Sequence, residues 1–200
     1  MSSPLQQYGD AWKELHSLSL HVEQFDDSIM DKGNAQSLQS FKLERNYTDQ
    51  TLEHAYCWPL KSLTLIGDRF TNDGLAHVYG LSNIQSLHLD GNAFTGQDVI
   101  ENGDKWIQLK SLELLGSGFN DSAIKHASFW NLQSIKLSQS KYFTDKVITE
   151  THRWKGLTSL VLHGDGFTGD IIQAYNHRLT RIPHAQWETM QHRRSYQARK

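Results

Sequence analysis

The chain has 200 residues, 38% of them hydrophobic, and carries 20 Lys and Arg against 22 Asp and Glu. Residues 1–175 carry more Asp and Glu than Lys and Arg, and this acidic body makes the chain a poor nucleic-acid binder by itself. A single cysteine, Cys57, excludes an internal disulfide. Because no apolar run has transmembrane length and Met1 to Asp10 lacks a signal-peptide pattern, we expect an intracellular, soluble protein, with the cytoplasm favoured.

One sequence unit recurs seven times along most of the chain. Each copy has apolar residues at its first, fourth and sixth places, and an aromatic residue follows four to six places after the sixth. The copies begin at Leu15, Leu38, Leu60, Ile84, Leu109, Leu132 and Leu157. The aromatic residues are Phe25, Tyr47, Phe70, Phe94, Phe119, Phe143 and Phe167. Successive copies are about 24 residues apart, and a period of this length predicts a solenoid of stacked repeats.

Within each copy, places one to seven are expected to form a short strand. Side chains at places four and six, such as Leu63 and Leu65, would enter the core, while places three, five and seven would face the concave side. Gly often occupies place eight, where the chain bends tightly. After the aromatic, Thr or Asn with Asp is expected to cap a short helix or single turn. In the sixth copy, residues 139–142 add one position, which predicts a small bulge.

Five tryptophans stand two or three places before the first apolar residue of a copy. They are Trp12, Trp58, Trp106, Trp130 and Trp154. A role in stacking a cofactor or a base would require them on an open face. We expect them instead to pack where the outer segment turns back into the next strand.

These features resemble the leucine-rich-repeat family. The L-x-x-L-x-L segment of that family is matched in register by all seven copies, over roughly residues 12 to 175. Place nine, which the family usually fills with Asn or Cys, reads Glu23, Asn46, Asp68, Asn92, Ser117, Ser140 and Asp165. The Thr48-Asp49 type of pair resembles the helical-backed repeats of F-box-associated members, although this sequence has no F-box. The resemblance implies an α/β solenoid with parallel strands on the concave face, short helices or turns on the convex face, and a protein-binding surface.

Places five and seven supply the candidate binding residues of the concave face, because place three is Ser in every copy. This face would span about 29 Å, given the usual spacing of parallel strands. Apolar side chains among charges can anchor and orient a partner, although scattered apolar residues are also ordinary surface. The candidates are Lys42, Glu44, Thr64, Ile66, His88, Asp90, Glu113, Leu115, Lys136, Val161 and His163, with Ile66, His88, Asp90, Glu113 and Leu115 at the centre.

Neither catalysis nor metal binding has a matching constellation in the sequence. No Ser of place three has a base at fixed spacing, so a nucleophile is not expected. His54, His77 and His126 share a position in their copies, but no Cys or carboxylate joins them at ligand spacing. Gly residues occur one per turn rather than in a phosphate-binding loop. We therefore expect no cofactor, no metal and no enzyme activity.

Residues 176–200 are treated as a separate basic tail after a solenoid of residues 1–175. The tail carries six Lys and Arg against one Asp or Glu, whereas the solenoid carries 14 against 21. Pro183 could start a helix with Trp187 and Met190 on one face, which would cap the last repeat. Arg193, Arg194, Arg199 and Lys200 are candidate contacts for RNA or an acidic protein, although a basic tail can also simply be solubilising.

Two functions follow as hypotheses. The first is a non-catalytic protein-interaction module, a scaffold or recognition subunit of a larger assembly. The alternative is an RNA-associated subunit of a ribonucleoprotein particle that uses the basic tail. Only fourteen residues precede Leu15, so we further expect another protein to cover the first strand.

Overall fold

The computed structural model describes residues 11–21, 35–53, 55, 58–76, 78–168, 174–189 and 194–197. These residues form one nine-stranded sheet whose spatial order follows the sequence, with eight parallel strands and a last antiparallel one. The strands are β1 (Ser17–Leu20), β2 (Ser40–Glu44), β3 (Ser62–Ile66), β4 (Ser86–Asp90), β5 (Ser111–Leu115), β6 (Ser134–Ser138), β7 (Ser159–His163), β8 (His184–Thr189) and β9 (Arg194–Gln197).

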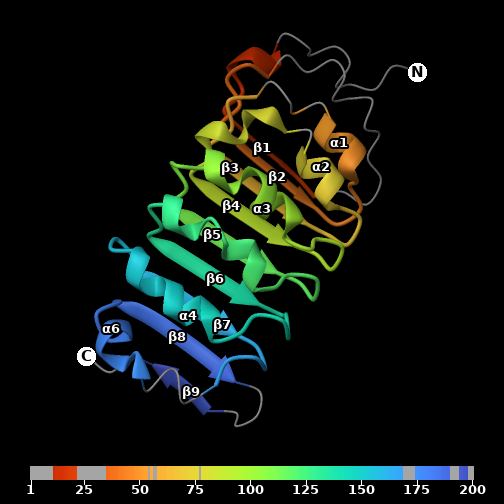
Figure 1. Cartoon of the computed structure of the whole chain (residues 1–200). Helices are drawn as coiled ribbons and strands as arrows, with labels where there is room; N and C mark the ends of the chain where they lie inside the picture. Colours follow the sequence, from red (N-terminus) through yellow and green to blue (C-terminus); the bar gives the residue numbers. More distant parts are fainter. Residues whose placement is uncertain are drawn as a thin grey trace.

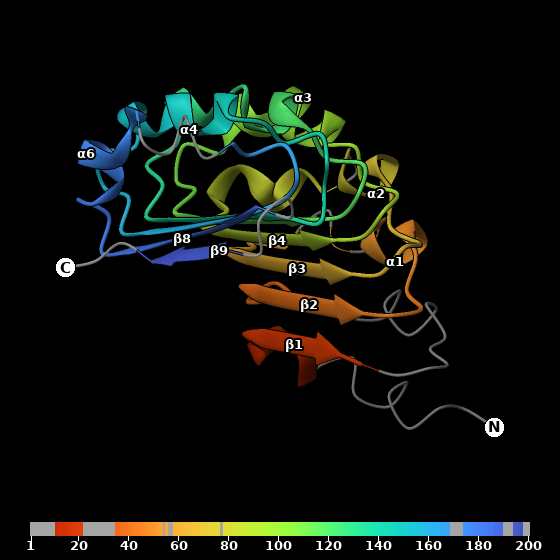
Figure 2. The same ribbon diagram turned by 90° about the horizontal axis from the view of Figure 1, so that it is seen from below.

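In the described part of the chain, the α-helices lie together on one side of the sheet (Figures 1 and 2). The α-helices are α1 (Asp49–Glu53), α2 (Asn72–Ala76), α3 (Gln97–Asn102), α4 (Lys146–Glu150) and α6 (Asn176–Leu179). The 3-10 turns are η2 (Ala11–Glu14), η5 (Tyr79–Asn83), η6 (Gly103–Lys105), η7 (Asp121–Ile124), η8 (Ala127–Phe129) and η9 (Thr151–Arg153). The predicted α/β solenoid is therefore confirmed, with strands on one face and short helices on the other.

The strand register is the one that the repeat predicts. Ser17 pairs with Ser40, and this row continues through the place-three Ser of every later copy to Ser159. From β2 to β7, side chains at places four and six are buried at 0–1% exposure and form the core. Burying such aliphatic side chains stabilises the fold by about 1.5–3 kcal/mol each.

The aromatic and tryptophan columns both lie inside the solenoid. From Tyr47 to Phe167 the aromatic column is at most 2% exposed, and the ring centroids of Phe119 and Phe143 are 6.5 Å apart; Phe25 lies outside the described residues. All five tryptophans are buried, and the indole Nε1 of Trp130 donates a hydrogen bond to the Gly103 carbonyl at 2.6 Å. The predicted packing role of the tryptophans is confirmed.

Thr-Asp pairs link neighbouring repeats as well as capping helices. The Thr144 hydroxyl accepts from the Lys146 amide at 3.4 Å, which is the expected local cap. The Asp121 carboxylate of the preceding repeat accepts from the Thr144 amide at 2.7 Å and from its hydroxyl at 2.5 Å. The same double contact joins Asp49 to Thr71 and Asp145 to Thr168. The Asp therefore stabilises the stack rather than its own helix.

At place eight, in the turn after a strand, several repeats have a positive φ, a conformation that favours glycine. Gly67 and Gly116 have φ values of 153° and 143°, and a Cβ on Gly116 would come within 2.2 Å of the Gly91 carbonyl oxygen. Gln139 occupies the same place in the bulged sixth copy and has a φ of 65°. Place nine forms part of the expected polar ladder, because Asp68 accepts from Asn92 and Asn92 accepts from Ser117.

The C-terminal segment corrects two predictions. The residues after Pro183 form β8 rather than a helix, and β8 pairs with β7 in parallel, Leu160 opposite Ala185 and Leu162 opposite Trp187. Ile182 and Ala185 are buried at 7% and 3% exposure, so this segment is an eighth turn of the solenoid and not a separate tail. The physical reason is the open edge of β7, whose backbone groups require a partner strand. Met190 lies outside the described residues.

At the other end, β1 is the first strand of the sheet, and its Leu18 and Leu20 are only half-buried. Residues 1–10 and 22–34 lie outside the described residues, so the covering of this end by another protein stays a prediction. His54, Cys57 and His77 also lie outside them.

Candidate functional site

The surface formed by places three, five and seven of β2 to β7 is called the sheet face below. It brings together all eleven predicted binding residues. Place five runs in register from Lys42 through Thr64, His88, Glu113 and Lys136 to Val161. Place seven runs from Glu44 through Ile66 and Asp90 to Leu115, and His163 ends β7 at the same place. The alternation of the strands thus assembles residues that are up to 121 positions apart in sequence.

One group of charges lies on β2 beside the end of β1. The Glu44 carboxylate contacts the Nδ1 atom of His21 through one oxygen and the Lys42 ammonium through the other, the latter at 2.5 Å. The hydrogen bond from Lys42 and then that from His21 hold the pKa of Glu44 below its ordinary value. Glu44 is therefore ionised and oriented at neutral pH.

A second group spans three neighbouring strands. The Glu113 carboxylate lies 3.5 Å from Nδ1 of His88 on β4 and 3.6 Å from the Lys136 ammonium on β6. Burial lowers the pKa of His88, although the carboxylates of Glu113 and Asp90 act in the opposite direction. The Nε2 atom of His88 is buried without a hydrogen-bond partner. Burial of this nitrogen without a hydrogen-bond partner disfavours the charged imidazolium, so the ring is neutral at pH 7.

The three apolar residues of the sheet face differ in accessibility. Ile66 and Val161 are partly exposed, whereas Leu115 is only 7% exposed between Asp90 and Ser138 on the neighbouring strands. Leu115 therefore offers little surface to a partner, and Ile66 is the accessible apolar residue near the centre.

The predicted tail contacts are only partly described. Arg194 belongs to β9, which pairs with β8 in antiparallel fashion. Arg193, Arg199 and Lys200 lie outside the described residues.

A metal ion requires several ligating side chains close together, and their positions are known for the described ranges. Within them, no three His, Cys, Asp or Glu side chains lie close enough together to hold a metal ion. In the same part of the chain, no helix is both long and apolar enough to cross a membrane.

Fold and site together define a repeat solenoid with an open, charged and partly apolar sheet face. A search of protein-family models finds no match to the chain, and no curated protein matches it in sequence.

Proposed function

We propose that the chain is a non-catalytic protein-interaction module of the leucine-rich-repeat type, a scaffold or recognition subunit that binds a partner protein through the sheet face. The observation that carries this proposal is the placement of Ile66. It lies in register between Glu44 and Asp90, and the two groups of charges flank it on β2 and on β4 to β6.

Two features of this arrangement favour binding. Ion pairs hold Glu44 and Glu113 in defined positions, so a partner meets preformed charges and less side-chain entropy is lost on association. An apolar residue within a ring of charges is a typical anchor, with the charges orienting the partner.

A binding role also agrees with the contacts of the histidines. His21 and His88 contact Glu44 and Glu113, and neither ring is bonded to a Ser of place three in the described part of the chain. A Ser nucleophile requires such a base. We therefore assign the Ser column to packing of adjacent strands and propose no catalytic activity.

The test is capture of partner proteins from the native cell extract with three versions of the full-length chain. Ile66→Asp should abolish capture of a stoichiometric set of proteins that the unchanged chain retains. Tyr142→Asp is the matched control, because Tyr142 is 53% exposed and does not belong to places three, five or seven. Equal capture by all three versions would exclude the sheet face.

The same experiment addresses the RNA alternative. Capture that persists in Ile66→Asp but disappears after nuclease treatment or at moderate salt would indicate binding to nucleic acid through cations. We do not favour this alternative, because Arg194 of the predicted basic tail is part of the sheet.

A further inference from the structure

The two edges of the solenoid carry opposite charge. The amino edge is defined as the turns that lead into strands, residues 12–16, 36–39, 58–61, 82–85, 104–110, 128–133, 152–158 and 180–183. It carries seven Lys and Arg, namely Lys13, Lys61, Lys105, Lys110, Arg153, Lys155 and Arg181, against Glu14 and Asp104.

The carboxyl edge comprises the turns that follow the strands, residues 44–49, 66–72, 90–96, 115–121, 138–145 and 163–168. It carries seven acids, namely Glu44, Asp49, Asp68, Asp90, Asp121, Asp145 and Asp165, against Arg45, Arg69 and Lys141. A chain of nearly neutral charge thus has a basic edge and an acidic edge. Parallel strands bring all amino ends to one edge of the sheet, so the Lys and Arg of these turns gather there and the acids of the other turns gather at the opposite edge.

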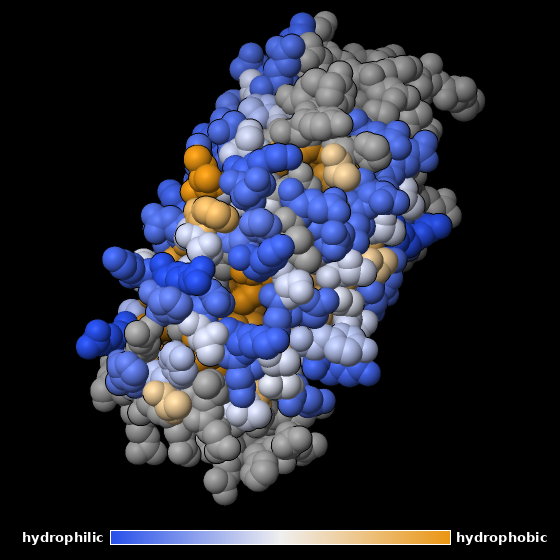
Figure 3. Space-filling view, in the orientation of Figure 1, coloured by the Kyte–Doolittle hydropathy of each residue, from blue (hydrophilic) through white to orange (hydrophobic). Residues whose placement is uncertain are grey.

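The amino edge also exposes two large apolar side chains, Ile107 at 64% and Phe129 at 60%. They belong to neighbouring turns, since the adjacent Trp106 and Trp130 stack with ring centroids 6.4 Å apart. Phe129 additionally stacks on His126 at 6.0 Å. Figure 3 shows hydrophobic surface at the left edge, where the strands begin, surrounded by strongly hydrophilic side chains.

Cations flank this apolar pair on both sides. Lys105 and Lys110 belong to the turn of Ile107, and Arg153 and Lys155 belong to the turn after Phe129. The turn of Phe129 and the turn of residues 152–158 are in contact, because the Thr158 hydroxyl donates to the Gln133 carbonyl at 3.0 Å. Lys110 and Lys155 are exposed and have no ion-pair partner among the described residues.

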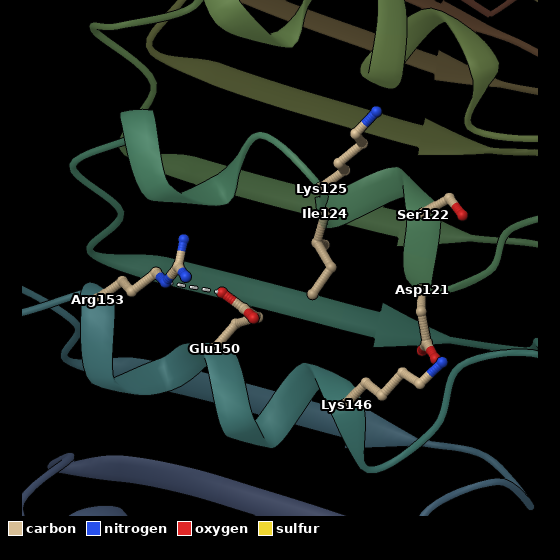
Figure 4. A pocket seen from close by; sticks show the side chains of 7 residues that line it. All are labelled: Asp121, Ser122, Ile124, Lys125, Lys146, Glu150 and Arg153. Carbon is tan, nitrogen blue, oxygen red and sulfur yellow. Dashed lines mark ion pairs between the residues drawn. The ribbon is translucent and has the colours of Figure 1, made fainter.

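A cavity of about 400 Å³ continues this surface from Arg153 onto the helical side, between η7 and α4. Figure 4 shows Arg153 beside Glu150, with which it forms an ion pair at 3.0 Å, and Lys146 reaching toward Asp121. The Asp121 carboxylate is already bonded through both oxygens to Thr144. The cavity is therefore lined by the cations Lys125, Lys146 and Arg153 together with the acids Asp121 and Glu150.

We infer that the amino edge between residues 104 and 158 binds an acidic peptide segment that also carries apolar side chains. Carboxylates of the peptide pair with Lys110, Lys155 and Arg153, and its apolar side chains cover Ile107 and Phe129. A peptide fits better than a nucleic acid, because an aliphatic residue lies at the centre and Asp104 and Glu150 interrupt the cations. This site is separate from the sheet face and does not depend on the function proposed for it.

The probe is a fluorescein-labelled peptide of alternating Glu and Leu, followed by fluorescence anisotropy with the full-length chain. The peptide should bind saturably and lose affinity as salt rises, because the paired charges are exposed. A matched peptide of alternating Lys and Leu should not bind. Phe129→Ser should weaken binding by about tenfold, which corresponds to the loss of one partly buried aromatic contact. Ile107→Ser should weaken it in the same direction.

The controls separate this site from the other surfaces. Lys155→Glu should weaken binding, whereas Lys141→Glu, the same change on the carboxyl edge, should leave it unchanged. Ile66→Asp should also leave it unchanged, so that loss of the sheet-face function does not remove this signal. Equal binding of the Lys-Leu peptide, no effect of the Phe129 and Ile107 variants, or tighter binding of a single-stranded oligonucleotide would overturn the inference.

Discussion

The carboxylate of Glu113 lies 3.5 Å from the imidazole Nδ1 of His88, on the strand beside it. Several groups on the sheet face shift the pKa of His88. Burial lowers it most, the carboxylates of Glu113 and Asp90 raise it, and the ammonium groups of Lys136 and Lys42 lower it. The net shift is downward from the ordinary value of 6.5. His88 is therefore neutral at pH 7, and acidification charges it at the centre of the proposed binding face.

The first prediction concerns this titration, followed by histidine NMR. His88 should titrate below 6.5 in the unchanged chain. Glu113→Gln should lower its pKa further, because an attractive charge is removed, and Lys136→Gln should raise it, because a repulsive charge is removed. A shift of the same sign in both variants would contradict the assignment of these neighbours.

Because the His88 pKa is lower in the folded chain, acidification destabilises the fold through this residue. Since the unfolded chain takes up the His88 proton at a higher pH than the folded chain, the unfolded state binds more protons in the window between the two pKa values. The free energy of unfolding therefore falls as pH drops below about 6.5 and is fully retained above it. Replacement of His88 by Gln should reduce this part of the acid destabilisation in urea unfolding at pH 7 and below.

The second prediction concerns the links between repeats. Asp121→Ala removes both acceptors of Thr144, whose amide and hydroxyl are partly buried, and should lower the free energy of unfolding by about 1–3 kcal/mol. Asp165→Ala is the control, because Asp165 is exposed and has no hydrogen bond in the described ranges. Chemical denaturation measures both, and similar losses in the two variants would argue against a specific role of the link.

The third prediction concerns the turn at place eight. Gly116→Ala adds a Cβ at a φ of 143° and within 2.2 Å of the Gly91 carbonyl oxygen, so the turn must shift and the chain should lose at least about 1 kcal/mol. Gln139→Gly relieves a side chain held at a φ of 65° and should be neutral or stabilising by up to about 1 kcal/mol. Thermal unfolding of both variants checks the contrast, which equal destabilisation would refute.

Much of this architecture follows from the repeat. Ser at place three and apolar residues at places four and six recur at one period. This recurrence predicts both the register and the buried face, and the structure has both. The sheet-face residues were predictable for the same reason. The burial of Leu115 was not, because a place-seven residue is exposed or covered according to its neighbours on adjacent strands rather than its own type.

The cations of the amino edge were harder to recognise. Lys110, Lys155 and Arg153 occupy different places in their copies, so comparing one column at a time does not reveal them. The Asp-to-Thr links were also missed, because an Asp after Thr reads as a local helix cap. The contact arises only when one repeat stacks on the next, which places the Asp carboxylate beside the Thr of the next repeat.

The eighth turn was missed because its apolar pattern is weak. Ile182 and Ala185 stand at places one and four, but Pro183 and a small residue in place of Leu favoured a helix start over a strand. Proline is tolerated here, since place two lies before the paired residues of β8, which begin at His184. The open edge of β7 decides the outcome, and no local propensity encodes that edge.

The fourth prediction tests this strand by its alternation. Ala185 is 3% exposed opposite Leu160, while the next residue, Gln186, is exposed opposite Val161. Ala185→Asp buries a carboxylate against the core and should lower the free energy of unfolding by about 3 kcal/mol or more, whereas Gln186→Asp should change it by less than about 0.5 kcal/mol. Hydrogen exchange should also accelerate in β7 in the first variant only, because β7 then loses its partner strand. If both variants were tolerated equally, residues 184–189 would not form a strand with one buried face, and the solenoid would end at β7.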